Sequence, residues 1–106
     1  AIAQAKQQLQ AAGVRSQLLV DCSHGNSSKD HTLQAGALKD VVEQRLAGNT
    51  DIIGCMAESN LEAGKQNLGD DPSKLSYGVS ITDACIGWEE TQELLTWTYG
   101  RLGDAV

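Results

Sequence analysis

The chain has 106 residues, of which 41% are hydrophobic and 21% are charged, a composition typical of one small globular domain. Its net charge of -6, with 8 Lys and Arg against 14 acidic residues, argues against binding to nucleic acid or to an anionic membrane surface. No apolar run approaches the roughly 18 residues that span a bilayer, and the amino-terminal segment lacks the pattern of a secretion signal. We therefore expect a cytoplasmic protein with no membrane partner.

The three cysteines, Cys22, Cys55 and Cys85, are an odd number and lie far apart. A disulfide framework would need an even set, so a reducing compartment is the simpler interpretation. None has the Cys-x-x-Cys spacing of a zinc or redox site. We expect each to be a small packing side chain.

The first predicted elements are a helix and a strand. Apolar residues recur at helical spacing over residues 1–12, and Gly13 follows as a C-terminal cap. The apolar run that comes next predicts a strand over about 17–22.

A second helix and strand follow a Gly-Asn-Ser-Ser turn. Ser27 with Asp30 three residues later resembles a capping box, and an apolar stripe predicts a helix over about 30–47. Gly48 should end this helix, and the next apolar run predicts a strand over about 51–57.

The last third of the chain is less regular at first. Glycines, polar residues and the single proline over 59–76 indicate a short helical turn followed by a long loop. A third strand is predicted over about 77–82 and a final helix over Trp88–Leu102, with acidic residues in its first turns. The predicted order is therefore αβαβαβα, an α/β domain over residues 1–106 with about three parallel strands.

Three of the apolar runs end near residues that bind metals: His24, Glu58 and Asp83. If the runs are neighbouring parallel strands, their carboxyl ends lie at one edge of a sheet, where these side chains could converge. Such residues also cap helices or lie in solvent, and the spacing alone leaves these alternatives open. His31 has no comparable position and is expected to be solvated.

Three long motifs in this chain, over 19–29, 53–60 and 77–89, closely resemble the C-terminal third of class I 3-deoxy-D-arabino-heptulosonate 7-phosphate (DAHP) synthases. The resemblance implies the last three units of a (β/α)8 TIM barrel, and hence a segment of a larger fold. It also implies the condensation of phosphoenolpyruvate with erythrose 4-phosphate, which begins the shikimate pathway to aromatic amino acids.

By motif match, the metal ligands implied by the resemblance are His24, Glu58 and Asp83, of which His24 and Asp83 are also expected to be catalytic. The family's fourth ligand, a cysteine, belongs to an earlier strand and does not correspond to a cysteine of this chain. Nitrogen, oxygen and sulfur ligands together suit Mn, Fe, Co or Zn. We expect activity only from a longer parent, which we expect to be a homo-oligomer. The alternative is a non-catalytic α/β domain that self-associates through its open strand edges.

Overall fold

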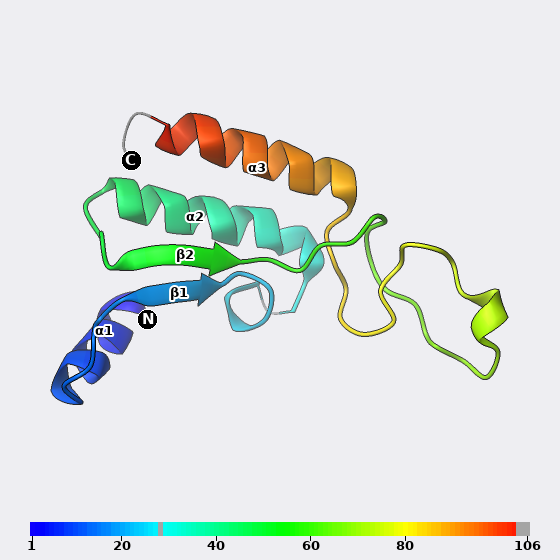
Figure 1. Cartoon of the computed structure of the whole chain (residues 1–106), viewed down its shortest axis with the longest axis horizontal. Coiled ribbons are helices and arrows are strands. Elements are labelled where there is room, and N and C mark those ends of the chain that lie inside the picture. Colours follow the sequence, from blue (N-terminus) through cyan, green and yellow to red (C-terminus); the bar gives the residue numbers. More distant parts are fainter. Residues whose placement is uncertain (28, 104–106) are drawn as a thin grey trace.

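A computed structural model describes residues 1–27 and 29–103. In that part of the chain, helices and parallel strands alternate and then give way to a long irregular segment (Figure 1): α1 Ile2–Ala11, β1 Leu18–Asp21, α2 Gln34–Leu46, β2 Ile52–Met56 and α3 Trp88–Leu102. Single turns of 3-10 helix occur at Gly25–Ser27, His31–Leu33 and Pro72–Lys74. The predicted α/β class and the helices predicted over 1–12, 30–47 and 88–102 are confirmed.

Both predicted glycine stops are found where the sequence places them. Gly13 has φ 75° and Gly48 has φ 116°, backbone conformations that glycine adopts without steric cost. The N–H of Gly48 donates to the carbonyl of Arg45, which satisfies one of the free carbonyls at the end of α2.

The predicted capping box at Ser27 and Asp30 is wrong. Ser27 is buried in the first 3-10 turn, and its hydroxyl donates to the carbonyl of Ser23 at 2.7 Å. Asp30 caps the second 3-10 turn alone, since its Oδ1 accepts from the N–H of Thr32 at 2.9 Å. The acidic residue, rather than the serine, therefore begins the helical segment that leads into α2.

Strands β1 and β2 form a parallel pair in which Val20 lies opposite Cys55. A register shift between Leu18 and Leu19 makes Ile53 an extra residue on β2, as in a β-bulge. The buried core joins this pair to α2, α3 and the segment before α3: Cys22, Leu38, Val41, Val42, Ile52, Ile86 and Leu94. Helices α2 and α3 thus pack against one face of the two strands.

The predicted third strand over 77–82 is wrong. Gly78 has φ 79°, which breaks an extended conformation, and Ile81 is 48% exposed. This run bonds to a loop instead: the N–H of Gln66 donates to the carbonyl of Ser80 at 2.7 Å.

The residues just after β2 pair instead with the segment around Ile86, which follows residues 77–82 in the sequence. The N–H of Ile86 donates to the carbonyl of Glu58, and the N–H of Asn60 donates to the carbonyl of Ile86. These bonds give one isolated parallel bridge between Ser59 and Ile86. Because Ile86 is only 1% exposed, it supplies the buried contact expected of a third strand.

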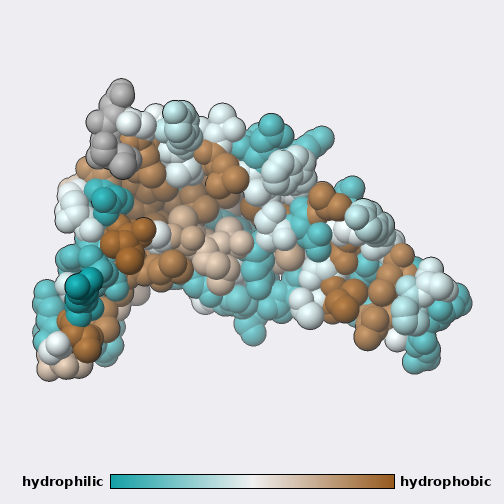
Figure 2. Space-filling view, in the orientation of Figure 1, coloured by the Kyte–Doolittle hydropathy of each residue, from teal (hydrophilic) through white to brown (hydrophobic). Residues whose placement is uncertain are grey.

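Residues 61–82, which we call the excursion, project away from the body (Figure 1). Their helical turn, Pro72–Lys74, comes late in the segment, whereas the sequence predicted it at the start. Large apolar side chains remain exposed on the body, such as Leu19 and Ile53, and on the excursion, such as Leu68. Figure 2 shows hydrophobic surface in both places.

The cysteines are free thiols, and Cys22 and Cys85 are buried while Cys55 is half-buried, as the sequence predicts for packing side chains. Within the part of the chain that the structure describes, no helix has the length and apolar character needed to cross a membrane.

Candidate metal centre

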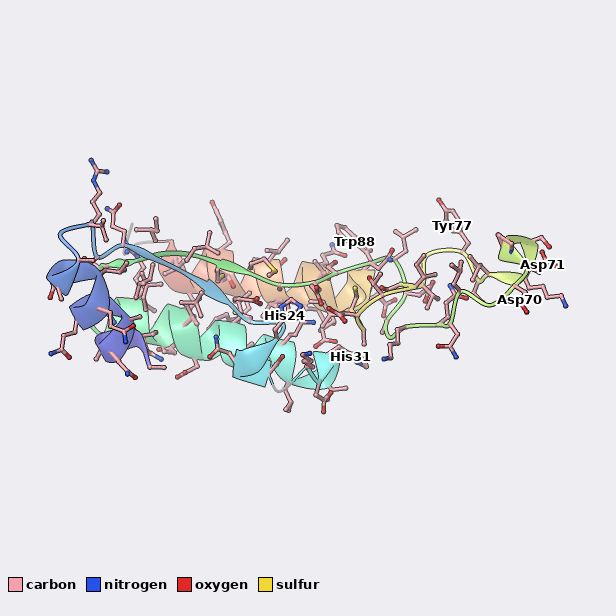
Figure 3. The ribbon with its side chains drawn as sticks, turned by 90° about the horizontal axis from the view of Figure 1, so that it is seen from below. His24, His31, Asp70, Asp71, Tyr77 and Trp88 are labelled. Carbon is pink, nitrogen blue, oxygen red and sulfur yellow. The ribbon has the colours of Figure 1, made fainter. Side chains whose placement is uncertain are left out.

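The three residues singled out in the sequence come together in the structure. One ligand atom from each of His24, Glu58 and Asp83 can be chosen so that all three lie within 4.8 Å of one another. His24 follows β1, Glu58 follows β2, and Asp83 precedes the segment that lies beside Glu58. Figure 3 shows His24 near the middle of the molecule, far from Asp70 and Asp71 at the tip of the excursion.

Both carboxylates approach the same ring nitrogen of His24. Nε2 lies 3.1 Å from Oδ2 of Asp83 and 3.3 Å from Oε1 of Glu58. Two ligands that each lie about 2.1 Å from one cation are separated by roughly 3.0–3.4 Å in octahedral or tetrahedral geometry. Both nitrogen-to-oxygen distances are therefore compatible with a shared divalent ion.

The other ring nitrogen of His24 is held by Asp21. Nδ1 lies 2.7 Å from Oδ2 of Asp21, and a carboxylate only accepts, so Nδ1 carries the proton of this hydrogen bond. The N–H of Ser23 donates to the second oxygen, Oδ1, at 2.8 Å. Asp21 thereby fixes the ring orientation and leaves Nε2 as the nitrogen that faces Glu58 and Asp83.

The pKa values of this pair reflect the same contacts. The hydrogen bond to Asp21 raises the pKa of His24 above its usual value, and the contact with Asp83 adds to the rise. The hydrogen bond from His24, with that from the Ser23 N–H, lowers the pKa of Asp21. In the absence of a metal ion, the negative charge around the ring thus favours a proton on His24. The same charge would favour a metal cation in place of that proton.

The sequence did not predict the contact between Asp21 and His24. From the sequence alone Asp21 is expected to be a buried, hydrogen-bonded acid near the site; the hydrogen bonding is confirmed, whereas the burial is wrong, since the side chain is 41% exposed. Its position three residues before the histidine, at the end of a strand, was the available signal. His31 lies outside the cluster, in the second 3-10 turn, and is half-buried rather than fully solvated. Ser28, which the first motif includes, lies outside the described residues.

Comparison with known proteins agrees with the motifs. The sequence model of the DAHP synthetase I family matches residues 1–96. This chain belongs to that family. The resemblance predicted from the three motifs is confirmed, and it extends over most of the chain.

Individual members of the DAHP synthetase I family give the same answer. The chain is 49% identical over 94 residues to the Tyr-sensitive phospho-2-dehydro-3-deoxyheptonate aldolase of Escherichia coli K12, covering 89% of this chain and 26% of that protein. It is 46% identical over 102 residues to the aldolase AMT16 of Alternaria alternata, covering 95% of this chain and 27% of that protein. The chain therefore spans about a quarter of the length of these relatives.

A solved relative shares the fold of the chain. The phospho-2-dehydro-3-deoxyheptonate aldolase of Francisella tularensis SCHU S4 superposes with a TM-score of 0.85 at 39% identity, covering 96% of this chain and 29% of that one. The backbone of this chain, with its excursion and its two-stranded sheet, therefore closely follows the structure of a DAHP synthetase I family member.

Proposed function

We propose that this chain supplies the metal-binding part of a DAHP synthase, which condenses phosphoenolpyruvate with erythrose 4-phosphate and releases phosphate. Membership of the family supports the reaction. The observation that carries the proposal for this chain is the convergence of His24, Glu58 and Asp83, whose ligand atoms lie within 4.8 Å of one another.

The donor set indicates which ions the site would hold. One imidazole nitrogen and two carboxylate oxygens suit Mn, Fe, Co or Zn, and a further ligand would come from outside this group. When bound, such an ion would act as a Lewis acid on the aldehyde of erythrose 4-phosphate, the acceptor for C3 of phosphoenolpyruvate.

The residues of the chain have separate tasks in this proposal. His24 presents Nε2, while Asp21 keeps the proton on Nδ1 at 2.7 Å and so leaves Nε2 free to ligate. Glu58 and Asp83 supply negative charge on the same side of the ring. The side chain of Asp83 is 59% exposed, so solvent and substrate can reach this side of the site.

The exposure of one face of the two-stranded sheet supports the proposal that the sheet belongs to a larger barrel. Val20 and Ile52 contribute to the packing against the helices, whereas Leu19, on the other face of β1, is 64% exposed. In a (β/α)8 barrel, that face points inward and is filled by layers of apolar side chains from all the strands. We propose that residues 1–106 form the last units of such a barrel in a cytoplasmic enzyme.

The decisive experiment uses the natural gene product that contains residues 1–106, stripped of metal with a chelator. Titration with Mn²⁺ or Co²⁺ should restore formation of DAHP from the two substrates. His24→Ala should abolish tight metal binding and activity, whereas His31→Ala, at the other histidine of the chain, should change neither. Full activity without metal, or equal metal affinity in His24→Ala, would refute the proposal.

A second candidate is a non-catalytic, self-associating domain. It is favoured by the exposure of Leu19 and of Met56 on the face of the strands away from the helix-packed core. In that case, sedimentation should show a dimer that dissociates in Leu19→Asp, together with no metal-dependent activity. An oligomer that persists in Leu19→Asp and makes DAHP would instead support the first proposal and an interface elsewhere.

A further inference from the structure

Beneath the three candidate ligands lies a small group of buried polar side chains. Ser23 is 3% exposed, Ser27 is 2% exposed and Gln34 is fully buried. Ser23 directly precedes His24, and Gln34 is the first residue of α2, whose start lies beside the carboxyl ends of β1 and β2 (Figure 1).

Two of these side chains meet at the backbone of Glu58. Its N–H donates to Oγ of Ser23 at 2.8 Å and to Oε1 of Gln34 at 2.9 Å. The hydroxyl of Ser23 donates in turn to the same Oε1 at 3.0 Å. A backbone N–H is always a donor, so the amide of Gln34 must face it with its oxygen.

The amide of Gln34 is only partly hydrogen-bonded. Burying its unpaired nitrogen costs free energy, which indicates that the amide oxygen is the functional atom. Among the described residues, its Nε2 is a buried polar atom without a hydrogen-bond partner. A methionine would fill similar space without leaving a polar group unpaired. The contribution of Gln34 therefore lies in the two hydrogen bonds that Oε1 accepts.

These bonds connect two candidate ligands that lie 34 positions apart in the sequence. Ser23 fixes the backbone next to His24, Glu58 is held by its own N–H, and Gln34 joins both to the start of α2. A shift of either backbone would change the 3.3 Å separation of His24 Nε2 and Glu58 Oε1.

We propose that Ser23 and Gln34 are positioning residues for the metal centre, which set the spacing of His24 and Glu58 by sharing the backbone N–H of Glu58. The inference rests on the proposed metal-binding function. Neither residue offers a ligand to the ion; both act through the residues they hold.

The test measures Co²⁺ affinity and the visible absorption spectrum of the cobalt-loaded natural gene product. Ser23→Ala and Gln34→Met each leave one acceptor for the N–H of Glu58, and each should weaken binding about tenfold. The double variant leaves no acceptor, so its loss should exceed the product of the single losses. The cobalt absorption bands should shift in all three variants, because the ligand geometry changes.

Val42→Ala is the matched control, since Val42 is also buried on α2 but lies eight positions after Gln34 and has no side-chain group that could join the hydrogen bonds of the network. It should lower stability while leaving cobalt affinity and spectrum unchanged. If the double variant does not fold, the two single variants decide the question. Single variants that bind and absorb as Val42→Ala does would overturn the inference, whereas an absence of cobalt binding in the unmodified protein would overturn the proposed function itself.

Discussion

Asp21→Asn offers a sharp test of how the candidate metal centre works, because asparagine has the shape of aspartate but only one acceptor oxygen. Asp21 uses both of its oxygens as acceptors: one for the N–H of Ser23 at 2.8 Å and one for Nδ1 of His24 at 2.7 Å. The backbone N–H cannot change its role, so the asparagine oxygen should turn towards Ser23. Its amide nitrogen then faces His24 as a donor.

The expected result is the wrong tautomer of His24. When Nδ1 must accept, the proton moves to Nε2, which is the nitrogen 3.3 Å from Glu58 and 3.1 Å from Asp83. A protonated Nε2 cannot bind a metal. We expect Co²⁺ affinity above neutral pH to fall by about 10- to 100-fold, the range for the loss of a carboxylate that orients a histidine ligand.

The pH dependence adds an independent check. Asp21 is the largest cause of the raised pKa of His24, so the unmodified site loses metal affinity at a higher pH than an ordinary histidine would. In Asp21→Asn this cause is gone, and proton competition begins at lower pH. The difference in affinity between the two proteins should therefore shrink as the pH falls.

The assay is competition for Co²⁺ against a chromophoric chelator between pH 6 and pH 8.5 or so, a range that brackets the usual histidine pKa. Asp71→Asn is the matched control: Oδ1 of Asp71 also accepts from an N–H two residues on, that of Ser73 at 3.0 Å, but on the excursion and away from any histidine. Affinity in Asp21→Asn within twofold of the unmodified protein, or a difference that widens as the pH falls, would refute the reasoning.

Three further predictions concern the fold and the thiols. Ile86 is 1% exposed and Ile81 is 48% exposed. Ile86→Ala should therefore lower the free energy of unfolding in urea by about 2–5 kcal/mol, and Ile81→Ala by less than about 0.5 kcal/mol. Equal losses would contradict the corrected strand position. Gly78→Ala should cost about 1–2 kcal/mol in the same assay because φ is 79° and the added Cβ would lie 2.8 Å from a side-chain carbon; an unchanged midpoint would argue against this turn. The neighbouring thiol of Cys22 lowers the pKa of Cys55 below its usual value, so iodoacetamide should alkylate Cys55 faster at neutral pH than it alkylates an ordinary thiol. Cys22→Ala should slow this reaction, and an unchanged rate would rule out the influence of Cys22.

The helices and the two strands could be predicted because their signals are local. Apolar spacing over α1, α2 and α3 marks the faces that pack, and Gly13 and Gly48 end two of the helices with positive φ. None of these features depends on a distant part of the chain. Such elements are therefore readable from composition and period alone.

The third strand failed because a strand is defined by its partner. Residues 77–82 have a suitable apolar pattern, yet Gly78 turns the backbone and Ser80 bonds to the loop at Gln66. The shorter run that contains Ile86 lies beside Glu58 instead and is buried. Alternation of apolar and polar residues indicates that a segment can adopt an extended conformation. It does not indicate which of two neighbouring segments pairs with the sheet.

The candidate ligands were predictable, but the residues that support them were not. His24 and Glu58 follow apolar runs and belong to long motifs, so both sequence position and resemblance pointed to them. Ser23 and Gln34 carry the opposite signal, since a serine in a turn and a glutamine at a helix start are normally exposed. Their burial follows from the N–H of Glu58, which lies beyond the last residue of β2 and finds acceptors only in side chains. Because Ser23 and Gln34 accept from the N–H of Glu58, these two side chains become part of the candidate site.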